Sequence, residues 1–340
     1  MDEKNDQPVP PALRMMAMVT GFQVSQALYV VAELGVATAL ADGPLPCAEL
    51  AERVGCDPDA LRRIIRFLAS AGVFQVDGDS VRATPLGLTL ADGAPGSMRD
   101  IARYFMQTHY LPFTDLLHTA RTGENAAQHH LGMPFFDWVN KSPHLVELQN
   151  RAMAAGAGGR DEAFFAGYRL PPGDVVVDVG GADGSVLGHL LAHEPDRRGV
   201  VLDLPDVIAA ARDEHAASAV ADRVDLVAGD FFDEVPAGDV YFLSVVLHNW
   251  DDDSAGRILA TIAAAAPGGA RVVLLETVLP EGEIPVFEAI LDLTMLAVLN
   301  GRERTACEWQ VLLERNGFAL DRIVETATPF SFVEATLAAR

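Results

Sequence analysis

The spacing of apolar residues changes character near residue 170, so the two parts of the chain predict different architectures. In the first part, the apolar residues of Asp57–Gly72 fall three or four positions apart and share one helix face. Asp57 suits the N-cap, Pro58 the first helical position, and Gly72 the end of this helix. We therefore predict a helix here that buries one face.

A short hairpin is predicted directly after this helix. Residues Phe74–Thr84 alternate apolar and polar side chains around a turn at Asp77–Ser80. Two helices followed by a hairpin are typical of a winged-helix domain, a fold that often binds DNA. The segment Cys47–Leu90, however, carries five arginines and six acidic residues, so its charge does not favour DNA. We expect residues 1–99 to form a scaffold or a dimer-forming domain.

Residues 100–168 are helical in tendency and rich in aromatic side chains, methionine and histidine. Such side chains at helical spacing are more often part of a core than of a ligand site, but helices between two domains also form pockets. We predict that this segment links two domains and contributes to a substrate pocket. His129 and His130 are adjacent and point in different directions on a helix, which disfavours a metal site there.

Residues 169–340 alternate short runs of β-branched residues with helical stretches. Strands separated by helices specify an α/β fold, in which helices cover both faces of a parallel sheet. Ligands of such Rossmann-like sheets bind at the carboxyl ends of the strands, so the loops after the runs are candidate sites. The runs are Asp174–Val179, Gly199–Asp203, Arg223–Gly229, Asp239–Val246 and Arg271–Thr277.

Composition and charge narrow the possible functions. With 340 residues, half of them hydrophobic, the chain can bury a sizeable core in two domains. Its net charge of −23 repels nucleic acid and acidic membrane surfaces. An acidic N-terminal stretch, and an apolar run, Ala27–Leu40, that Glu33 interrupts, favour neither a secretory signal nor a membrane span.

The three cysteines are odd in number and lack a C-x-x-C spacing, so neither a disulfide framework nor a thiolate zinc site is indicated. We therefore expect a cytoplasmic protein with no metal ion and no nucleic-acid or membrane partner.

A glycine turn follows the first run of the α/β part. Its spacing does not match the G-x-G-x-x-G of dinucleotide sites, and Asp178 and Asp183 would oppose a pyrophosphate at the helix N-terminus. A cationic ligand fits better. S-adenosylmethionine carries an ammonium and a sulfonium group and no phosphate, so acids beside a glycine turn suit it. The candidate residues for this ligand are Asp178, Gly180, Gly181 and Gly184.

Two further runs end in residues that suit the same ligand. Asp203 ends the second run, where a carboxylate can hold both ribose hydroxyls, and Leu204 follows it. Asp230 and Phe231, after the third run, offer an acceptor for the adenine amino group and a contact for its ring. A glycine turn alone is a weak signal, but three features in order, each at a strand end, strengthen the prediction.

His248 is the candidate catalytic residue, because it follows the fourth run at the edge of the sheet where the ligand is expected. Methyl transfer to a phenol or enol requires the hydroxyl to lose its proton, and histidine, with an ordinary pKa of about 6.5, is a suitable base. Glu276 and Glu303 are candidates for a carboxylate that orients the ring and stabilises its protonated form. Either glutamate alone is more commonly an exposed loop acid.

Several motifs carry a resemblance to a known family. The motifs are ELGVATAL, RRIIRFLASAGVF, DVGGADG, GDFF, LHNWDD and the stretch that contains NGRERT, and they span nearly the whole chain. The chain resembles the bacterial members of the plant-type small-molecule O-methyltransferases, which act on phenols and on aromatic polyketide or phenazine scaffolds. The resemblance implies a Rossmann-like methyltransferase sheet with an N-terminal, mostly helical winged-helix domain that builds a homodimer.

The resemblance also implies roles for single residues. It implies that His248 is the base and that Glu276 and Glu303 are its partners. The implied cofactor contacts are Gly180, Asp203, Asp230, Phe231 and Ser244, and the implied substrate contacts are Met153, Met295 and Asn300.

The expected reaction is methyl transfer from S-adenosylmethionine to a hydroxyl of a small aromatic natural product, which leaves S-adenosylhomocysteine. Because one fold hosts several chemistries, two alternatives stay open. One is a relative that uses the bound cofactor for C- or N-methylation, hydroxylation or decarboxylation, and the other is a winged-helix sensor without catalysis.

Overall fold

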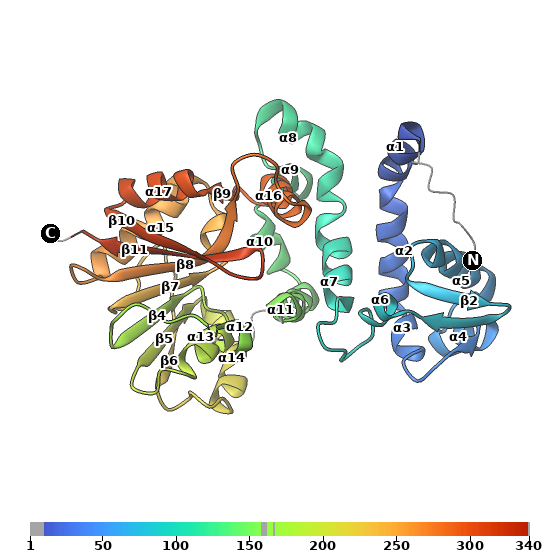
Figure 1. The fold of residues 1–340 in the computed structure, drawn as a ribbon, viewed down its shortest axis with the longest axis horizontal. Coiled ribbons are helices and arrows are strands. Elements are labelled where there is room, and N and C mark those ends of the chain that lie inside the picture. Colours follow the sequence, from blue (N-terminus) through green and yellow to red (C-terminus); the bar gives the residue numbers. More distant parts are fainter. Residues whose placement is uncertain (1–9, 158–161, 166, 339–340) are drawn as a thin grey trace, which may run out of the picture. The chain divides into compact units, whose positions relative to one another are not determined.

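The chain folds into two compact units, shown in Figure 1. The computed structural model describes residues 10–157, 162–165 and 167–338. Unit 1 contains Met1–Leu111 and Phe136–Gly158, and unit 2 contains Pro112–Phe135 and Gly159–Arg340. The chain therefore passes between the units three times, and residues 100–168 are shared between both. The predicted division into residues 1–99, 100–168 and 169–340 by role stays a prediction.

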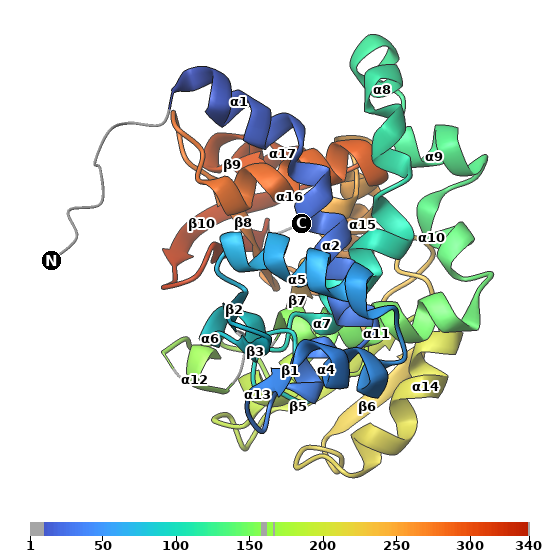
Figure 2. The ribbon, with the colours of Figure 1, turned by 90° about the vertical axis from the view of Figure 1, so that its right-hand side faces the viewer.

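Unit 1 is mostly helical and holds one small antiparallel sheet of strand order β1-β3-β2 (Figure 2). Its strands are β1 (Leu45–Pro46), β2 (Phe74–Asp77) and β3 (Ser80–Ala83). Its helices are α1 (Pro11–Val19), α2 (Gly21–Glu33), α3 (Val36–Ala39), α4 (Cys47–Val54), α5 (Pro58–Ser70), α6 (Pro85–Leu88), α7 (Arg99–Tyr104), the π-helix η1 (Phe105–His109), α10 (Phe135–Val139), which begins at the unit boundary, and α11 (Pro143–Ala157).

Helix α5 confirms the helix that the apolar spacing predicts. The Asp57 carboxylate accepts a hydrogen bond from the Ala60 backbone N–H at 2.8 Å, which satisfies one of the free donors of the first turn. Gly72, just past the helix end, has a φ of 80°, a conformation that glycine adopts without strain. The buried face consists of Leu61, Ile65 and Leu68. The hairpin that follows, β2 and β3, also confirms the prediction.

Unit 2 is built on a mixed sheet of strand order β10-β11-β8-β7-β4-β5-β6, with the short β9 paired to β8. Its strands are β4 (Val175–Val179), β5 (Arg198–Asp203), β6 (Val224–Ala228), β7 (Val240–Ser244), β8 (Arg271–Leu279), β9 (Arg304–Thr305), β10 (Phe318–Glu325) and β11 (Phe330–Leu337). The five predicted strands, β4 to β8, are parallel to one another. The strands β10 and β11 were not predicted, and they add an antiparallel edge.

Helices cover both faces of this sheet, as the strand pattern predicts (Figure 1). Neighbouring residues of β4 point to opposite faces, so Val177 belongs to the buried cluster that contains residues of α15 and α17, whereas Val176 belongs to the cluster that contains residues of α12, α13 and α14. The helices of unit 2 are η2 (Pro112–Asp115), α8 (Leu116–Thr122), α9 (Ala126–Leu131), α12 (Glu162–Phe165), α13 (Ser185–Leu191), α14 (Pro205–Ala216), η3 (Leu247–Asn249), α15 (Asp252–Ala265), α16 (Val286–Val298) and α17 (Ala306–Arg315).

Within the described residues, no single helix combines the length and the apolar composition that a membrane span requires. Helices α1 and α2 meet both criteria only when they are counted together across a 45° bend.

The N-cap of α5 gives a first prediction. Replacing Asp57 with Ala removes a capping hydrogen bond, so we expect the free energy of unfolding of unit 1 to fall by about 1 kcal/mol in urea denaturation. Asp59 lies in the first turn of the same helix, and D59A removes an equal charge without removing the cap. We expect D59A to lower the free energy by only a few tenths of a kcal/mol. Equal losses in both variants would contradict the capping role.

Candidate active site

The glycine turn lies across the carboxyl ends of β4 and β5. The Gly180 N–H donates to the Leu202 carbonyl of β5 at 2.8 Å, and Gly180 has a φ of 75°. A Cβ atom at Gly181 would lie 2.5 Å from the carboxyl carbon of Asp178, so only glycine fits there without a shift. A Cβ atom at Gly184 would lie 2.9 Å from a methyl group of Val201. The turn is therefore pressed against Asp178 and the second strand.

The Asp178 carboxyl group is buried beneath this turn and is 1 % exposed. Neither of its oxygens has a hydrogen-bond partner in the part of the chain that the structure describes. Burial, and then the nearby charges of Asp203 and Asp183, raise the pKa of Asp178 to about 8. A buried acid without a partner is costly unless a ligand supplies one, so the group is suited to a cationic ligand.

Asp203 fastens the glycine turn to the end of β5. Its Oδ2 accepts a hydrogen bond from the Ala182 N–H at 2.8 Å, and its Oδ1 accepts one from the Leu204 N–H at 2.7 Å. Ala182 has a φ of 51°, an unusual conformation for a residue other than glycine, and the Asp203 carboxylate helps to hold it. Each carboxylate oxygen keeps a further lone pair, which a ligand hydroxyl can use.

The loops after β6 and β7 adjoin the same turn. A ring carbon of Phe231 lies 3.6 Å from the position that a Gly180 Cβ would take, and a Val246 methyl group lies 3.1 Å from it. Asp230 Oδ1 accepts a hydrogen bond from the Phe232 N–H at 2.8 Å. Ser244 is the last residue of β7. The structure thus brings the predicted cofactor residues of four strand ends to one edge of the sheet.

His248 lies in η3, directly after β7, and is 5 % exposed. The hydrogen bond between its Nδ1 and Glu303 Oε1 measures 2.7 Å. Because an ionised carboxylate only accepts hydrogen bonds, we assign the ring proton to Nδ1, which leaves Nε2 as the basic atom of the neutral ring. The pairing of His248 with Glu303, which the sequence predicts, is present in the structure.

Glu276 does not bond to the His248 ring. Its Oε1 instead accepts backbone N–H hydrogen bonds from Val246, Leu247 and His248 at 3.0, 2.8 and 3.4 Å. Successive N–H groups that converge on one anion form a nest, so Glu276 holds the loop that carries the histidine. The sequence does not distinguish this backbone role from the ring-orienting role that it predicts for both glutamates.

The charges around His248 set its basicity. Burial lowers the pKa of His248, but the carboxylates of Glu276 and Glu303 outweigh burial and the opposing charge of Arg304, so the pKa is raised overall. Burial raises the pKa of Glu276 to about 7, with a further contribution from Glu303. Both glutamates are fully buried, which explains why these interactions are not weakened by solvent.

A tight strap, residues 299–304, packs against the histidine loop. The Arg302 N–H donates to the His248 carbonyl at 2.9 Å, and a Cβ atom at Gly301 would lie 1.9 Å from the same oxygen. Asn125 donates to the Leu299 carbonyl at 2.5 Å. Asp292 of α16 accepts a hydrogen bond from the Glu303 N–H at 3.0 Å. The strap therefore fixes the backbone that presents Glu303.

The three predicted substrate residues lie in different places. Met295 is buried in α16, and Asn300 is exposed on the strap. Met153 is half-exposed on α11 of unit 1, and its role in the same site stays a prediction. His129 and His130 are exposed on α9. Among the described residues, no group of three or more His, Cys, Asp or Glu side chains is arranged to hold a metal ion.

Sequence reasoning missed Gly301, Asp292 and Arg304 as parts of the site. Arg304 is fully buried beside Glu303. The nearest signal in the sequence is the capping box of Thr305 and Glu308, which begins α17 directly after the strap. Gly301 and Asp292 act through close backbone contacts, which leave no pattern in a single sequence.

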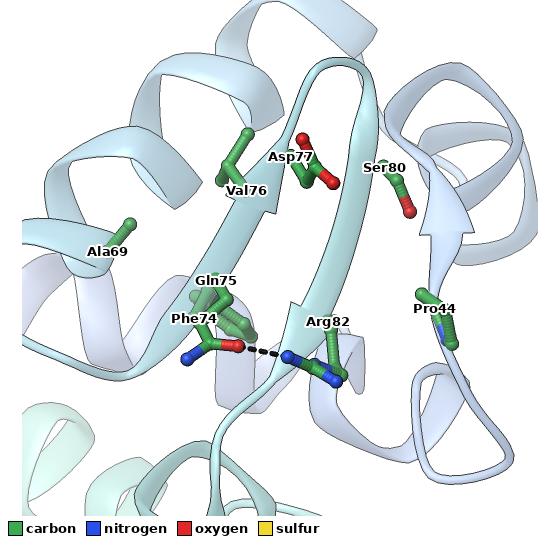
Figure 3. A pocket seen from close by; sticks show the side chains of 8 residues that line it. All are labelled: Pro44, Ala69, Phe74, Gln75, Val76, Asp77, Ser80 and Arg82. Carbon is green, nitrogen blue, oxygen red and sulfur yellow. Dashed lines mark hydrogen bonds between the residues drawn. The ribbon is translucent and has the colours of Figure 1, made fainter.

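A separate hollow of about 580 Å³ lies beside the hairpin of unit 1, as Figure 3 shows. Arg82 donates a hydrogen bond to Gln75 inside it, so two of its polar side chains satisfy each other. It contains none of the predicted site residues. Its lining consists of Pro44, Ala69, Phe74, Gln75, Val76, Asp77, Ser80 and Arg82.

Comparisons with known proteins agree on one family. Residues 113–319 match the model of the O-methyltransferase domain, and residues 16–93 match that of the O-methyltransferase dimerisation domain. The chain is 40% identical to phenazine O-methyltransferase PhzM of Lysobacter antibioticus, over 96% of each chain. It is 31% identical to phenazine-1-carboxylate N-methyltransferase of Pseudomonas aeruginosa, over 94% of this chain and 96% of that one.

Solved structures give the same result. The structure of LaPhzM matches with a TM-score of 0.91 and 39% identity, covering 97% of this chain and 100% of that one. The O-methyltransferase NcsB1 from neocarzinostatin biosynthesis, solved with S-adenosylmethionine and 2-hydroxy-5-methyl naphthoic acid, matches with a TM-score of 0.82 and 32% identity. That match covers 93% of this chain and 96% of the other.

The charge balance around His248 gives a second prediction. In an NMR titration of the ligand-free protein, we expect the His248 ring to titrate above its ordinary pKa of 6.5. In E303Q the carboxylate that stabilises the protonated ring is lost, so the midpoint should fall. Glu314 is an exposed acid on α17, and E314Q should leave the midpoint unchanged. A midpoint in E303Q at or above that of the unmodified protein would contradict this account.

Proposed function

This chain belongs to the O-methyltransferase family, and on that premise we propose that it transfers a methyl group from S-adenosylmethionine to a hydroxyl of a small aromatic natural product, with His248 as general base. The observation that carries the proposal is the buried hydrogen bond between His248 Nδ1 and Glu303, at 2.7 Å, in a loop that adjoins the glycine turn. Methyl transfer to a hydroxyl needs a base at this edge of the sheet, and a carboxylate-oriented histidine supplies one.

The residues around the glycine turn fit S-adenosylmethionine. The unpartnered carboxyl group of Asp178 suits the ammonium group, and the remaining lone pairs of Asp203 suit the ribose hydroxyls. Asp230 and Phe231 suit the adenine, and Gly180, Gly181 and Gly184 leave room for the backbone to approach the ligand. Leu204 and Ser244 complete the proposed contacts. When bound, S-adenosylmethionine supplies a methyl group on a positively charged sulfur, which is open to attack by a nucleophilic oxygen.

His248 then removes the proton of the attacking hydroxyl. With Nδ1–H donated to Glu303, Nε2 is free to accept that proton, and the Glu303 carboxylate stabilises the imidazolium that results. Glu276 holds the loop by three backbone N–H groups, so the ring does not need to reorganise during the step. Most of the acceleration then comes from placing the hydroxyl in line with the methyl group, and base catalysis adds to it.

The acceptor is proposed to be a fused aromatic ring with a hydroxyl group. Support comes from the phenazine that names one relative and from the hydroxynaphthoic acid in the structure of another. Met295 and Asn300 of unit 2 are the proposed contacts for this ring, and the role of Met153 as a substrate contact stays a prediction from the sequence. The match of residues 16–93 to a dimerisation domain supports a homodimer.

N-methylation is the second candidate, because a relative that is 31% identical over nearly its full length is an N-methyltransferase. A panel of acceptors that pairs each hydroxyarene with its amino analogue separates the two reactions. Transfer to the amine alone, with the hydroxyl analogue left unmodified, would contradict the proposal.

The base role of His248 gives a third prediction. We expect H248Q to lower kcat by about 10²–10⁴-fold at neutral pH, because only the proton acceptor is lost. Binding of S-adenosylhomocysteine, measured by calorimetry, should stay unchanged. His215 on α14 donates a hydrogen bond from Nε2 to the Val224 carbonyl at 2.9 Å, and H215Q serves as the matched control with normal kcat. Full activity in H248Q would remove His248 from the mechanism.

The raised pKa of Asp178 gives a fourth prediction. At pH 7, below its pKa of about 8, this acid is mostly protonated in the free protein, and a cationic ligand lowers the pKa. Binding of S-adenosylmethionine should therefore release a proton at pH 7 and should strengthen as the pH rises toward 8. Calorimetry in two buffers of different ionisation enthalpy measures this release.

The D178N variant should bind more weakly and should lose that proton release. Asp196 is an exposed acid before β5, and D196N should behave as the unmodified protein does. If the proton release is the same in D178N, Asp178 is not the group that meets the cation.

A further inference from the structure

Arg304 is fully buried in β9 and makes an unusual number of polar contacts with the loop that carries His248. One guanidinium nitrogen, Nη1, donates to the Leu247 carbonyl at 3.2 Å, and Nη2 donates to the Trp250 carbonyl at 2.9 Å. Nε and Nη2 also donate to Asp252 Oδ1, at 3.0 and 2.8 Å. The guanidinium lies over the Trp309 ring, 5.0 Å from its centre. These contacts span both ends of the segment Leu247–Asp252.

The loop is held by opposite charges on its two sides. The Glu276 carboxylate receives the N–H groups of Val246, Leu247 and His248, and the Arg304 guanidinium donates to carbonyls on either side of the histidine. The loop needs such support because Val245, a β-branched residue, has a φ of 58°. A conformation of this kind is strained and persists only where the surroundings impose it.

We propose that Arg304 is a positioning residue for the reaction: it holds the Leu247–Asp252 segment so that the His248 ring stays opposite Glu303. The inference rests on the proposed function, because it treats His248 as the base. Glu303 and Arg304 are adjacent, and both side chains contact this loop: Glu303 bonds to the His248 ring, and Arg304 donates to the carbonyls of Leu247 and Trp250. A flexible lysine at this position would lack the planar fork that serves several acceptors at once.

The charge of Arg304 has a second effect on the same histidine. The charged groups that face His248 are Glu276 from β8, Glu303 from the strap and Arg304 from β9. The two carboxylates raise the pKa of His248, and Arg304 lowers it. Burial and, to a smaller extent, Arg304 thus oppose the two carboxylates and limit the proton affinity of this base. A base must be neutral to accept a proton, so this limit favours activity near neutral pH.

The test compares R304Q and R304K with R315Q, which removes an exposed arginine at the end of α17. NMR titration of His248 in the ligand-free protein reports its proton affinity without any need for turnover. The pH profile of kcat and the affinity for S-adenosylhomocysteine are measured on the same samples.

We expect R304Q to shift the NMR midpoint of His248 to higher pH, to shift the acid limb of the kcat profile in the same direction, and to lower kcat by about 10²-fold. R304K keeps the charge, so its midpoint should stay near that of the unmodified protein, while its kcat falls because the fork is lost. R315Q should change neither quantity. S-adenosylhomocysteine should bind all three variants equally.

The proposal is overturned if R304Q matches R315Q in both the His248 midpoint and kcat. If R304Q does not fold, R304K decides, and an unchanged kcat in R304K overturns the proposal. A shifted NMR midpoint in R304Q without a shift of the kcat profile would contradict the base role of His248, and with it the proposed function. The same result would still support the contact between Arg304 and the histidine loop.

Discussion

A buried carboxylate that receives three consecutive backbone N–H groups is the interaction on which the candidate site depends. Glu276 supplies it from β8, and the loop after β7 turns around it. Without an anion at this point, the turn would bury unpaired donors at a cost of about 1–3 kcal/mol each. With the anion in place, the sharp turn at Val245 is tolerated and His248 is presented to Glu303. The position of the His248 ring thus depends on backbone groups that the Glu276 carboxylate holds.

The sheet brings these groups together because five parallel strands end at one edge. The strand ends of β4, β5 and β6 carry the acids and glycines that suit a cationic nucleoside. The proposed base, His248, follows β7, and Glu276 of β8 holds its loop. The acids of these strand ends differ in their hydrogen bonding. Asp203 is engaged by backbone N–H groups, whereas Asp178 is left without a partner, so the ligand finds a rigid frame and one unsatisfied group.

Much of this could be predicted from the sequence, and the rest could not for physical reasons. Helix α5 and strands β4 to β8 follow from local patterns, namely a capping acid, apolar spacing and β-branched runs. The pairing of His248 with Glu303 followed from residue types at strand ends and from a family resemblance. The backbone role of Glu276 and the contacts of Arg304 depend on how loops that are distant in the sequence come together. The assignment of Pro112–Phe135 to unit 2 and of Phe136–Gly158 to unit 1 depends on tertiary packing. Local patterns contain neither.

The interleaved course of the chain limits how the protein can be divided. Unit 2 owns the segment Pro112–Phe135, which precedes a stretch that belongs to unit 1, so no single cut separates the two units. A fragment that begins at residue 169 would keep every strand of the large sheet but would lose Asn125, whose side chain holds the Leu299 carbonyl at the start of the strap. A cut before residue 112 would keep Asn125 with the large sheet but would carry Phe136–Gly158 away from the rest of unit 1. Gene fusions and domain exchanges between relatives should therefore keep both units together, since the large sheet inherits part of its support from upstream of its first strand.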